Sequence, residues 1–464
     1  METLEQKYEH EKIGKLLVMF SIPSVISLVL NALYNMVDQI FIGNGVGYLG
    51  NGATNVIFPL TQLAIAIGLL IGDGTASYMN LKLGEGKREE AEKGMAAGLL
   101  ALVVSGVTLS ILLTVFLRPL CQLFGATDDI MPYALDYGYI IVAGTIFNIF
   151  PCGAMSIVRG NGGPKTAMLS MLTGFTINMI GDPLTIYGFH WGVKGAAIAT
   201  VLGQAASAGV CIVYLARKKG TLKITRKSFD GCVRYVPKTA KLGLSSFVTQ
   251  LAIVVVLYFQ NNLLVKYGAL SKYGAEIPLT ALGVIMKVFT MLQNAITGLC
   301  SGAQPIISYN YGRELRGRVK KILKLLIVFS AALMGIATIW FQLAPMSIVH
   351  IFGSEDSLYN EFSVKCLRIF LMLIILDSFQ MVGSSFLQSI GKPLHATALV
   401  MFRQIIVQVP AMLILGKLMG VEGILYAGTL SSLLVGLLSI AFLAHEWKAL
   451  SERSTSTKTA YSAR

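Results

Sequence analysis

The residue of this sequence with the most distinctive chemistry is Asp38, a carboxylate in the second half of the first long apolar segment. A charge at membrane depth costs about 2.5 to 3.5 kcal/mol on insertion scales, so an acid inside a spanning helix is first of all a candidate functional group. Tyr34 and Asn35 lie one helical turn before Asp38 and give the predicted helix a polar stripe. The alternative is that Asp38 caps the outer end of the helix in water.

A second polar group lies in a later apolar segment, in the stretch Thr176-Ile-Asn-Met-Ile-Gly-Asp-Pro183. Asn178 and Asp182 are four residues apart and share one helix face, and Thr200 follows at a similar depth in the next segment. With Asp38 they would form an oxygen cluster that suits Na⁺, or a proton shared between carboxylates. Alternatively, Asp182 only orients the helix break that an Asp-Pro pair favours.

Further charged residues, Asp377, Lys287 and Arg403, also lie inside apolar segments. A buried ion needs a partner, so Asp377 either pairs with Lys287 or Arg403 as a structural bridge or belongs to a second titratable site. Pro23 interrupts the segment that carries Asp38 and leaves one carbonyl without its helical partner. It therefore marks either a static kink or a hinge.

These groups lie in what the composition identifies as a polytopic membrane protein. Of its 464 residues 54% are hydrophobic and only 13% are charged, and the mean hydropathy is +0.67. Apolar runs of about 20 or more residues recur from end to end, each able to cross roughly 30 Å of hydrocarbon. We predict an all-α fold of twelve transmembrane helices, near residues 16–42, 54–79, 95–117, 132–157, 165–188, 195–216, 242–266, 278–302, 319–341, 361–387, 393–416 and 422–446.

Lysine and arginine residues set the predicted orientation. Of the 38 in the chain, 29 fall on the side of the amino terminus and six on the opposite side, which by the positive-inside rule puts both termini in the cytoplasm. The net charge of +14 therefore reports topology, and we expect no nucleic-acid partner. The six cysteines have no metal-ligand spacing and the five histidines stand singly, so neither a Cys/His metal centre nor an enzyme is expected.

Internal repetition divides the chain in two. The sequence around Gly84 returns around Gly312, and Gly192 returns as Gly420, in both cases 228 residues later. Such matches predict two homologous six-helix lobes in parallel topology, a plan on which transporters place a substrate path between the halves. The predicted parts are an amino-terminal cytoplasmic tail (1–15), a first lobe (16–217), a cytoplasmic linker (218–240), a second lobe (241–446) and a disordered cytoplasmic tail (447–464).

Residues 12 to 446 resemble the multidrug and toxic compound extrusion (MATE) family. The resemblance is carried by the two repeats, by Pro23 and Asp38, by the pattern Asn178-x-x-x-Asp-Pro183 and by Gly195-Ala-Ala-Ile-Ala-Thr200. It implies a V-shaped bundle with a central cavity, and export of cationic, amphipathic compounds in exchange for H⁺ or Na⁺. It implies no cofactor, and it leads us to expect a multi-pass monomer in the bilayer of a bacterial plasma membrane.

Carried over by position, the resemblance also assigns roles to residues. Those that match the family's amino-terminal cation site, with H⁺ or Na⁺ as its occupant, are Asp38, Asn178, Asp182 and Thr200. Pro23 matches a hinge proline, and Tyr34 and Asn35 become candidates for polar contacts with substrate in the cavity. Asp377 resembles an acid of the NorM-type branch, but the acid which that branch has in span seven is missing here.

The nearest alternative function is a flippase for lipid-linked oligosaccharides, from the same superfamily. Its anionic pyrophosphate substrate would call for several arginines that face the cavity. Near mid-depth the sequence offers only Arg403 and Lys287, against the three acids singled out above, Asp38, Asp182 and Asp377. This balance favours cationic cargo.

Overall fold

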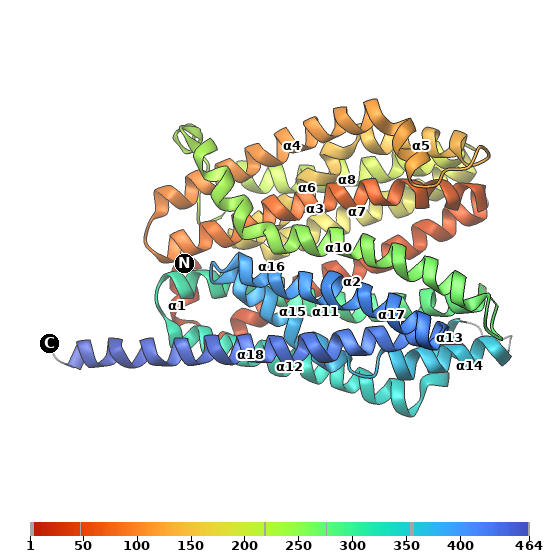
Figure 1. Ribbon diagram of the computed structural model, residues 1–464. Helices are drawn as coiled ribbons and strands as arrows, with labels where there is room; N and C mark the ends of the chain where they lie inside the picture. The colour runs from red at the N-terminus through yellow and green to blue at the C-terminus, as the bar shows by residue number, and fades with distance from the viewer. Residues whose placement is uncertain (1–3, 47, 218–219, 275, 353–356, 463–464) are drawn as a thin grey trace. The chain divides into compact units, whose positions relative to one another are not determined.

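The computed structural model describes residues 4–46, 48–217, 220–274, 276–352 and 357–462, and within them all regular structure is helical (Figure 1). Side chains are described except at residues 4, 34–40, 43–45, 48, 51, 351–352 and 452–462. Each of the twelve predicted spans falls on one helix or on a run of consecutive helices. The predicted all-α fold is confirmed, as expected for a chain that must satisfy its backbone hydrogen bonds within the bilayer.

The chain forms two compact units. Unit 1 comprises Met1–Gln250, Ser301–Leu315 and Gln388–Pro393. Unit 2 comprises Leu251–Cys300, Arg316–Leu387 and Leu394–Arg464. Unit 1 thus contains the first predicted lobe together with three short stretches of the second. The lobe boundaries predicted from the sequence repeats remain a prediction.

Unit 1 contains the helices of the first six predicted spans. They are α2 (Ile13–Val46), α3 (Tyr48–Gly84), α4 (Arg88–Leu123), α5 (Met131–Ala143), α6 (Thr145–Gly160), α7 (Pro164–Pro183) with η1 (Leu184–Gly188), and α8 (Gly192–Ala216). The shorter elements are α1 (Leu4–His10), α9 (Arg226–Phe229) and η2 (Cys232–Tyr235), the last two of which precede the first part of α10 (Val236–Gly268). In this unit α7 carries Asn178 and Asp182, and α8 carries Thr200.

Unit 2 contains the remaining spans, several of them in pieces. It includes the second part of α10 and most of α11 (Glu276–Gly312), followed by α12 (Arg316–Leu343), α13 (Pro345–Phe352), α14 (Ser357–Lys365), η3 (Cys366–Phe370), α15 (Ile374–Ser389), α16 (Pro393–Met401), η4 (Phe402–Gln408), α17 (Val409–Met419) and α18 (Val421–Ser462). The long helix α18 continues to Ser462, through most of the stretch predicted as a disordered tail. The ammonium of Lys320 in α12 lies over the Trp447 ring, 5.0 Å from its centroid, and this contact binds α18 to α12 at the start of that stretch.

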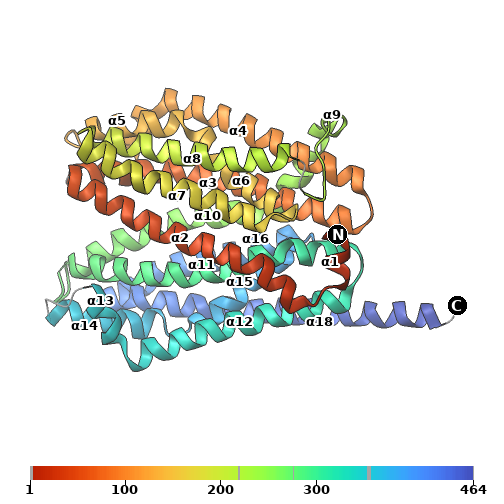
Figure 2. The same cartoon turned by 180° about the vertical axis from the view of Figure 1, so that it is seen from behind.

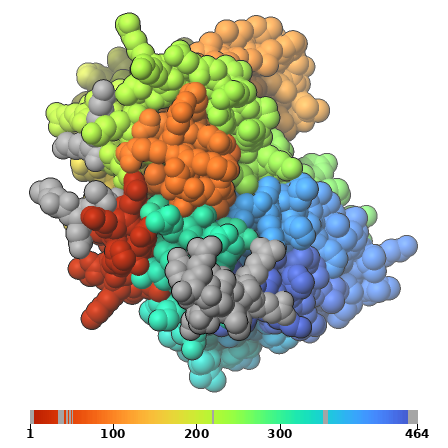
Figure 3. Space-filling view, turned by 90° about the vertical axis from the view of Figure 1, so that its left-hand side faces the viewer, coloured from red at the N-terminus to blue at the C-terminus, as the bar shows by residue number. Residues whose placement is uncertain are grey.

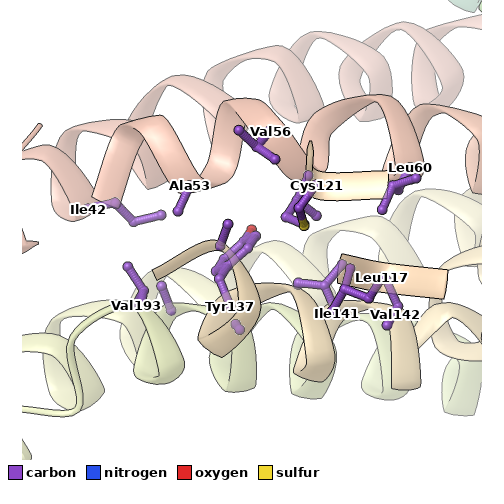
Figure 4. Packing of buried hydrophobic residues seen from close by; sticks show 14 of the residues in the cluster. Ile42, Ala53, Val56, Leu60, Leu117, Cys121, Tyr137, Ile141, Val142 and Val193 are labelled. Atoms are coloured by element: carbon purple, nitrogen blue, oxygen red, sulfur yellow. The ribbon is translucent and has the colours of Figure 1, made fainter. Parts of the chain in front are cut away.

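Apolar side chains from five helices form the main core of unit 1. Figure 4 shows those of α2 and α3 facing those of α4, α5 and α8, with Ile42, Ala53, Val56, Leu60, Leu117, Cys121, Tyr137, Ile141, Val142 and Val193 labelled. Because lipid is as apolar as these side chains, close packing between the helices, rather than escape from water, stabilises such a core at membrane depth. Helix α8 contributes to this core, and it also carries Thr200, one of the predicted site residues.

Several spans are interrupted, and the interruptions change how many helices count as spans. Among the described residues, nine helices are long and apolar enough to cross a membrane, or ten if the pair α5 and α6, bent by 50°, is one span. The other two predicted spans are α7 with η1 and the run α14, η3 and α15. Both of these contain a π-helical segment, and η1 directly follows the buried Asp182 and Pro183. Such π-bulges are frequent at functional sites.

The predicted amino-terminal tail is folded against unit 1. Glu5 forms an ion pair with Arg88 at 3.0 Å, and Glu9 forms one with Arg313, also at 3.0 Å. Between them the Tyr8 ring is completely buried. Figure 3 shows the red helix α1 beside the orange loop that follows α3 and the teal end of α11. Helix α1 therefore contacts the chain just after α3 and just after α11, two places that correspond to each other in the sequence repeat.

Candidate functional site

Three of the predicted site residues meet where α7 packs against α8. The side-chain amide of Asn178 donates to Asp182 Oδ1 at 3.2 Å and to Thr200 Oγ1 at 3.1 Å. Asp182 is completely buried, and Asn178 and Thr200 are also buried. We call these three residues the amide–carboxylate cluster. The structure brings them together as the i, i+4 spacing and the expected depth of Thr200 predicted.

Small residues allow the two helices to approach closely enough for these bonds. A methyl group on Gly203 would lie 2.6 Å from the Gly174 carbonyl oxygen, and one on Gly181 would lie 2.9 Å from the Ala199 side chain. Helices that cross in a membrane use such small residues to bring their backbones together. Figure 2 shows α7 and α8 running side by side, with α2 next to α7. The crossing therefore sets the Asn178-to-Thr200 distance.

The helix break after Asp182 has its own hydrogen-bond donor. Pro183 lacks an N–H group, and the chain widens into the π-helical segment η1 directly after it. The hydroxyl of Thr185 donates to the Gly181 carbonyl at 2.8 Å and approaches the Asp182 carbonyl at 3.4 Å. Thr185 thus binds carbonyls of the last α-helical turn before η1. Whether Asp182 only orients the break or binds an ion stays a prediction.

The side chains of Asp38, Tyr34 and Asn35 lie outside the described residues, but the helix that carries them is placed. Helix α2 packs against α7, and the Tyr187 hydroxyl of η1 donates to the Phe41 carbonyl at 3.2 Å. The stretch of α2 around residue 38 therefore runs beside the helices of the amide–carboxylate cluster. This placement is the one that a shared site of α2, α7 and α8 requires.

A different polar pair occupies unit 2. Asp377 is buried, and its Oδ2 forms an ion pair with Arg403 Nη2 at 3.1 Å. Arg403 Nη1 also donates to Gln380 Oε1 at 3.0 Å, and Gln380 donates to Ser384 at 3.0 Å. Of the two partners predicted for Asp377, the structure selects Arg403, which satisfies the charge as a buried bridge must. Lys287 is exposed and forms no ion pair among the described residues.

Sequence reasoning missed two kinds of polar residue. Gln380 and Ser384 lie on one face of α15, three and seven residues after Asp377, and that spacing could have identified them. A separate network forms around Asp73 of α3, which accepts hydrogen bonds from Ser156 and Ser246. Asp73 lies in a Gly-rich apolar stretch, so the same argument that identified Asp38 could have found it.

The amide–carboxylate cluster presents the kinds of oxygen atom that a hard cation prefers. Its donors are one carboxylate, one amide and one hydroxyl, and among the described residues no group of three His, Cys, Asp or Glu side chains could hold a metal ion. Oxygen donors of this kind suit Na⁺ or a proton better than a tightly held transition metal.

Comparison with known proteins assigns the family. A sequence profile of the MatE family matches residues 23–184 and 248–414, more than half of the chain. The chain belongs to the MatE family. It is similar to the multidrug export protein MepA of Staphylococcus haemolyticus (strain JCSC1435), 25% identical over 441 residues that cover 94% of this chain and 93% of that protein. MepA of Staphylococcus aureus (strain MRSA252) is 22% identical over 425 residues, which cover 91% of this chain and 92% of that protein.

Solved structures of MatE relatives share the fold. A MOP superfamily transporter from Pyrococcus furiosus matches with a TM-score of 0.88 at 22% identity, over 97% of this chain and 100% of that one. A MATE structure in the bent conformation matches with a TM-score of 0.89 at 22% identity, over 98% of this chain and 100% of that one. The resemblance seen in the sequence is confirmed, and this MatE protein is a multi-pass membrane transporter.

Proposed function

We propose that this MatE protein is a secondary active multidrug exporter that exchanges cationic, amphipathic compounds for H⁺ or Na⁺. The observation that carries the proposal is the amide–carboxylate cluster, a buried acid that accepts a hydrogen bond from a neutral amide inside a transporter fold. The names of its relatives, which are multidrug export proteins, support the substrate class. The proposed ion site comprises Asp38, Asn178, Asp182 and Thr200.

Ion binding at this site would have to replace existing hydrogen bonds. The Asn178 amide now directs its N–H₂ group at both Asp182 and Thr200. Na⁺ needs oxygen ligands, so rotation of the amide would present its carbonyl oxygen and free the other two oxygens for the ion. A proton would instead neutralise a carboxylate whose charge is costly to bury. Either ion would thus change the contact between α7 and α8.

The change would reach substrate through α2, which lies beside α7. Pro23 divides α2, and near it the Ser24 hydroxyl donates to the Phe20 carbonyl at 2.9 Å, while Ser27 donates to the Pro23 carbonyl at 2.7 Å. Such side-chain donors can keep backbone carbonyls satisfied while a helix bends. Coupling then requires only that the ion and the drug prefer different conformations of the protein.

The proposed charge of the cargo rests on which cationic side chains inside the spans could bind an anionic substrate. Arg403 is engaged by Asp377 and Gln380, so it is not available to a pyrophosphate. A flippase for lipid-linked oligosaccharides would need such cations, which is why cationic cargo is the better proposal. We also propose that the protein is a monomer in a bacterial plasma membrane with both termini in the cytoplasm, as its basic residues indicate.

Efflux of a fluorescent cation from proteoliposomes tests the function. A Na⁺ gradient and a pH gradient are imposed separately, on the wild type and on Asp182→Asn. We expect one gradient to drive wild-type efflux, and Asp182→Asn to lose about 5- to 150-fold of that rate, the range of typical coupling energies. Asp136→Asn is the matched control, since Asp136 is an exposed acid of α5 in an ion pair with Lys194. Absence of efflux under both gradients would favour the flippase instead.

A further inference from the structure

The Asp73 network of unit 1 contains none of the residues assigned to the ion site. Ser156 Oγ of α6 donates to Asp73 Oδ1 at 2.7 Å, and Ser246 Oγ of α10 donates to Asp73 Oδ2 at 2.8 Å. Arg159 donates to Ser156 Oγ at 2.9 Å, so the serine relays between the guanidinium and the carboxylate. Both oxygens of the acid are therefore bound, each by a hydroxyl from a different helix.

The same end of α3 is bound by two further chain segments. Gln304, in the last turns of α11, donates to Ser77 Oγ at 2.8 Å. Gln388, at the end of α15, accepts from Ser245 Oγ at 3.0 Å and donates to Ser246 Oγ at 3.3 Å. In the sequence repeat α3 belongs to the first lobe, whereas α10, α11 and α15 belong to the second. The Asp73 network thus joins parts of both repeats.

Glycines at this place bring the backbones into direct contact. A methyl group on Gly74 would overlap the Thr239 carbonyl oxygen, and one on Gly243 would overlap the Leu70 carbonyl oxygen. Helices α3 and α10 therefore touch with no side chain between them. Gly302, which is 228 residues after Gly74, makes the equivalent contact between α11 and α2 at Ser21.

A second pair of glycines repeats this arrangement further along the two helices. A methyl group on Gly84 would overlap the Tyr309 carbonyl oxygen, and one on Gly312 would overlap the Leu81 carbonyl oxygen. Each glycine and each carbonyl is 228 residues from its counterpart, so the contact between α3 and α11 is reciprocal. These close contacts lie toward the end of unit 1 that carries the loops 85–87 and 313–315, and we call them the seal.

Such a seal in an exporter must open once in each cycle. The glycine contacts are van der Waals contacts that separate without a penalty in charge, whereas the hydroxyls of Ser156 and Ser246 hold a carboxylate. Hydrogen bonds to a charged group are about twice as strong as neutral ones, and a carboxylate released from them is well solvated by water. An acid is therefore suited to hold a contact firmly and yet to release it into an aqueous opening.

We propose that Asp73 is the latch of this seal: it holds α10 against α3 through Ser246 in the closed state and releases Ser246 when this end opens. The latch rests on the proposed exporter function, since only a transporter that alternates between two openings needs to break this contact. Asp73 is a positioning residue, and it touches neither the drug nor the coupling ion. Arg159 orients the latch through Ser156.

Chemical labelling of a reporter thiol tests the latch. Thr239→Cys places the thiol on the face of α10 that contacts Gly74, where the native side chain is buried. A membrane-impermeant maleimide is added to purified protein, and labelling of the parent chain with its six native cysteines is subtracted. In this background Asp73→Ala and Ser246→Ala should raise the labelling rate about tenfold, the factor expected for loss of one hydrogen bond to a charged group.

Two further variants separate the latch from simple damage to the fold. Ser110→Ala removes a serine that donates to the Val142 carbonyl at 2.8 Å elsewhere in unit 1, and it should leave labelling unchanged. Gly243→Ala wedges the seal apart without touching the charge and should raise labelling. If Gly243→Ala labels faster while Asp73→Ala and Ser246→Ala label at the wild-type rate, the seal is steric and Asp73 is not its latch.

Transport measurements then distinguish failure of the latch from failure of the function. If the wild type drives efflux, Ser246→Ala should lower the maximal rate and lower the KM for drug, because the cytoplasmic opening is populated more often. A change in stability alone would not produce that combination. If no gradient drives wild-type efflux, the proposed function fails, whatever the labelling shows.

Discussion

Two buried carboxylates of this transporter are held in opposite ways. In unit 2 Asp377 forms an ion pair with the guanidinium of Arg403 at 3.1 Å, whereas in unit 1 the Asp182 carboxylate accepts from the neutral amide of Asn178 at 3.2 Å. A cationic partner that is part of the chain neutralises an acid permanently. A neutral donor leaves the charge of the acid in place.

The partners of the two acids, Arg403 and Asn178, also differ in their own surroundings. Arg403 is fixed at both ends of its guanidinium, by Asp377 and by Gln380, and its carbonyl accepts from Ser431 at 3.1 Å. Asn178 instead donates from a neutral amide to Asp182 and Thr200, and it lies at a crossing made of small residues. The comparison favours a structural role for the Asp377–Arg403 pair of unit 2 over a second ion site at Asp377. It predicts one coupling site per molecule.

The largest expected effect comes from removing the guanidinium. Arg403→Gln should lower the free energy of unfolding by about 3 to 5 kcal/mol, because it leaves Asp377 buried without its counter-charge. Thermal unfolding in detergent or lipid nanodiscs measures this loss. The double variant Arg403→Gln with Asp377→Asn should recover much of it, since the pair then contains no charge.

Lys287→Gln is the matched control for the guanidinium variant. Lys287 is a cation in the apolar part of α11, but it is exposed. Its substitution should change the unfolding free energy by no more than about 0.5 kcal/mol. Equal losses for Lys287→Gln and Arg403→Gln would contradict the view that the bridge is structural. If Arg403→Gln folds normally and gains a second ion-dependent step in efflux, the idea of one coupling site is wrong.

A smaller effect is expected where α7 crosses α8. Gly203→Ala should cost about 1 to 3 kcal/mol through overpacking, because its methyl group would lie 2.6 Å from the Gly174 carbonyl oxygen. It should also weaken ion-driven efflux, since Thr200 is moved away from Asn178. The measurements are thermal unfolding and efflux under the gradient that drives the wild type.

The same helix offers a control for this variant. A methyl group on Gly209 would have no atom within 4 Å, so Gly209→Ala should be neutral or stabilise by up to about 1 kcal/mol through helix propensity. Wild-type efflux in both variants would show that the distance between the helices does not matter to the ion site. The comparison between the two acids would then rest on charge alone.

Most of the fold could be predicted because its causes are local. Length, hydropathy and the 228-residue repeat located all twelve spans, and the i, i+4 spacing brought Asn178 and Asp182 to one face. The choice of Arg403 over Lys287 as partner of Asp377 could not be predicted, since it depends on how helices of unit 2 pack. Asp73 itself could have been found from its place in an apolar stretch, but its donors could not, because they come from α6 and α10, far away in sequence.

The smallest effect is expected for a third carboxylate, Glu85, which lies in the loop after α3. Its partners are Lys82 at 2.8 Å and Lys87 at 2.9 Å, and a third of its side chain is exposed. Burial raises the pKa of Glu85, but the two ammonium groups outweigh burial and hold that pKa below its ordinary value of 4.5. Water screens such pairs, so Glu85→Gln should lower the unfolding free energy by only about 0.2 to 1 kcal/mol at pH 7.

The pH dependence of that loss checks its electrostatic origin. Because the pKa of Glu85 is lower in the folded than in the unfolded state, the stabilisation is complete above pH 4.5 and disappears as the pH falls through the folded value. The difference in unfolding temperature between wild type and Glu85→Gln should therefore shrink when the pH is lowered from 7 to about 3. A difference that is the same at both pH values would mean that packing of Glu85 stabilises the loop. A loss at pH 7 as large as that of Arg403→Gln would remove the contrast between charges in water and charges inside the helix bundle.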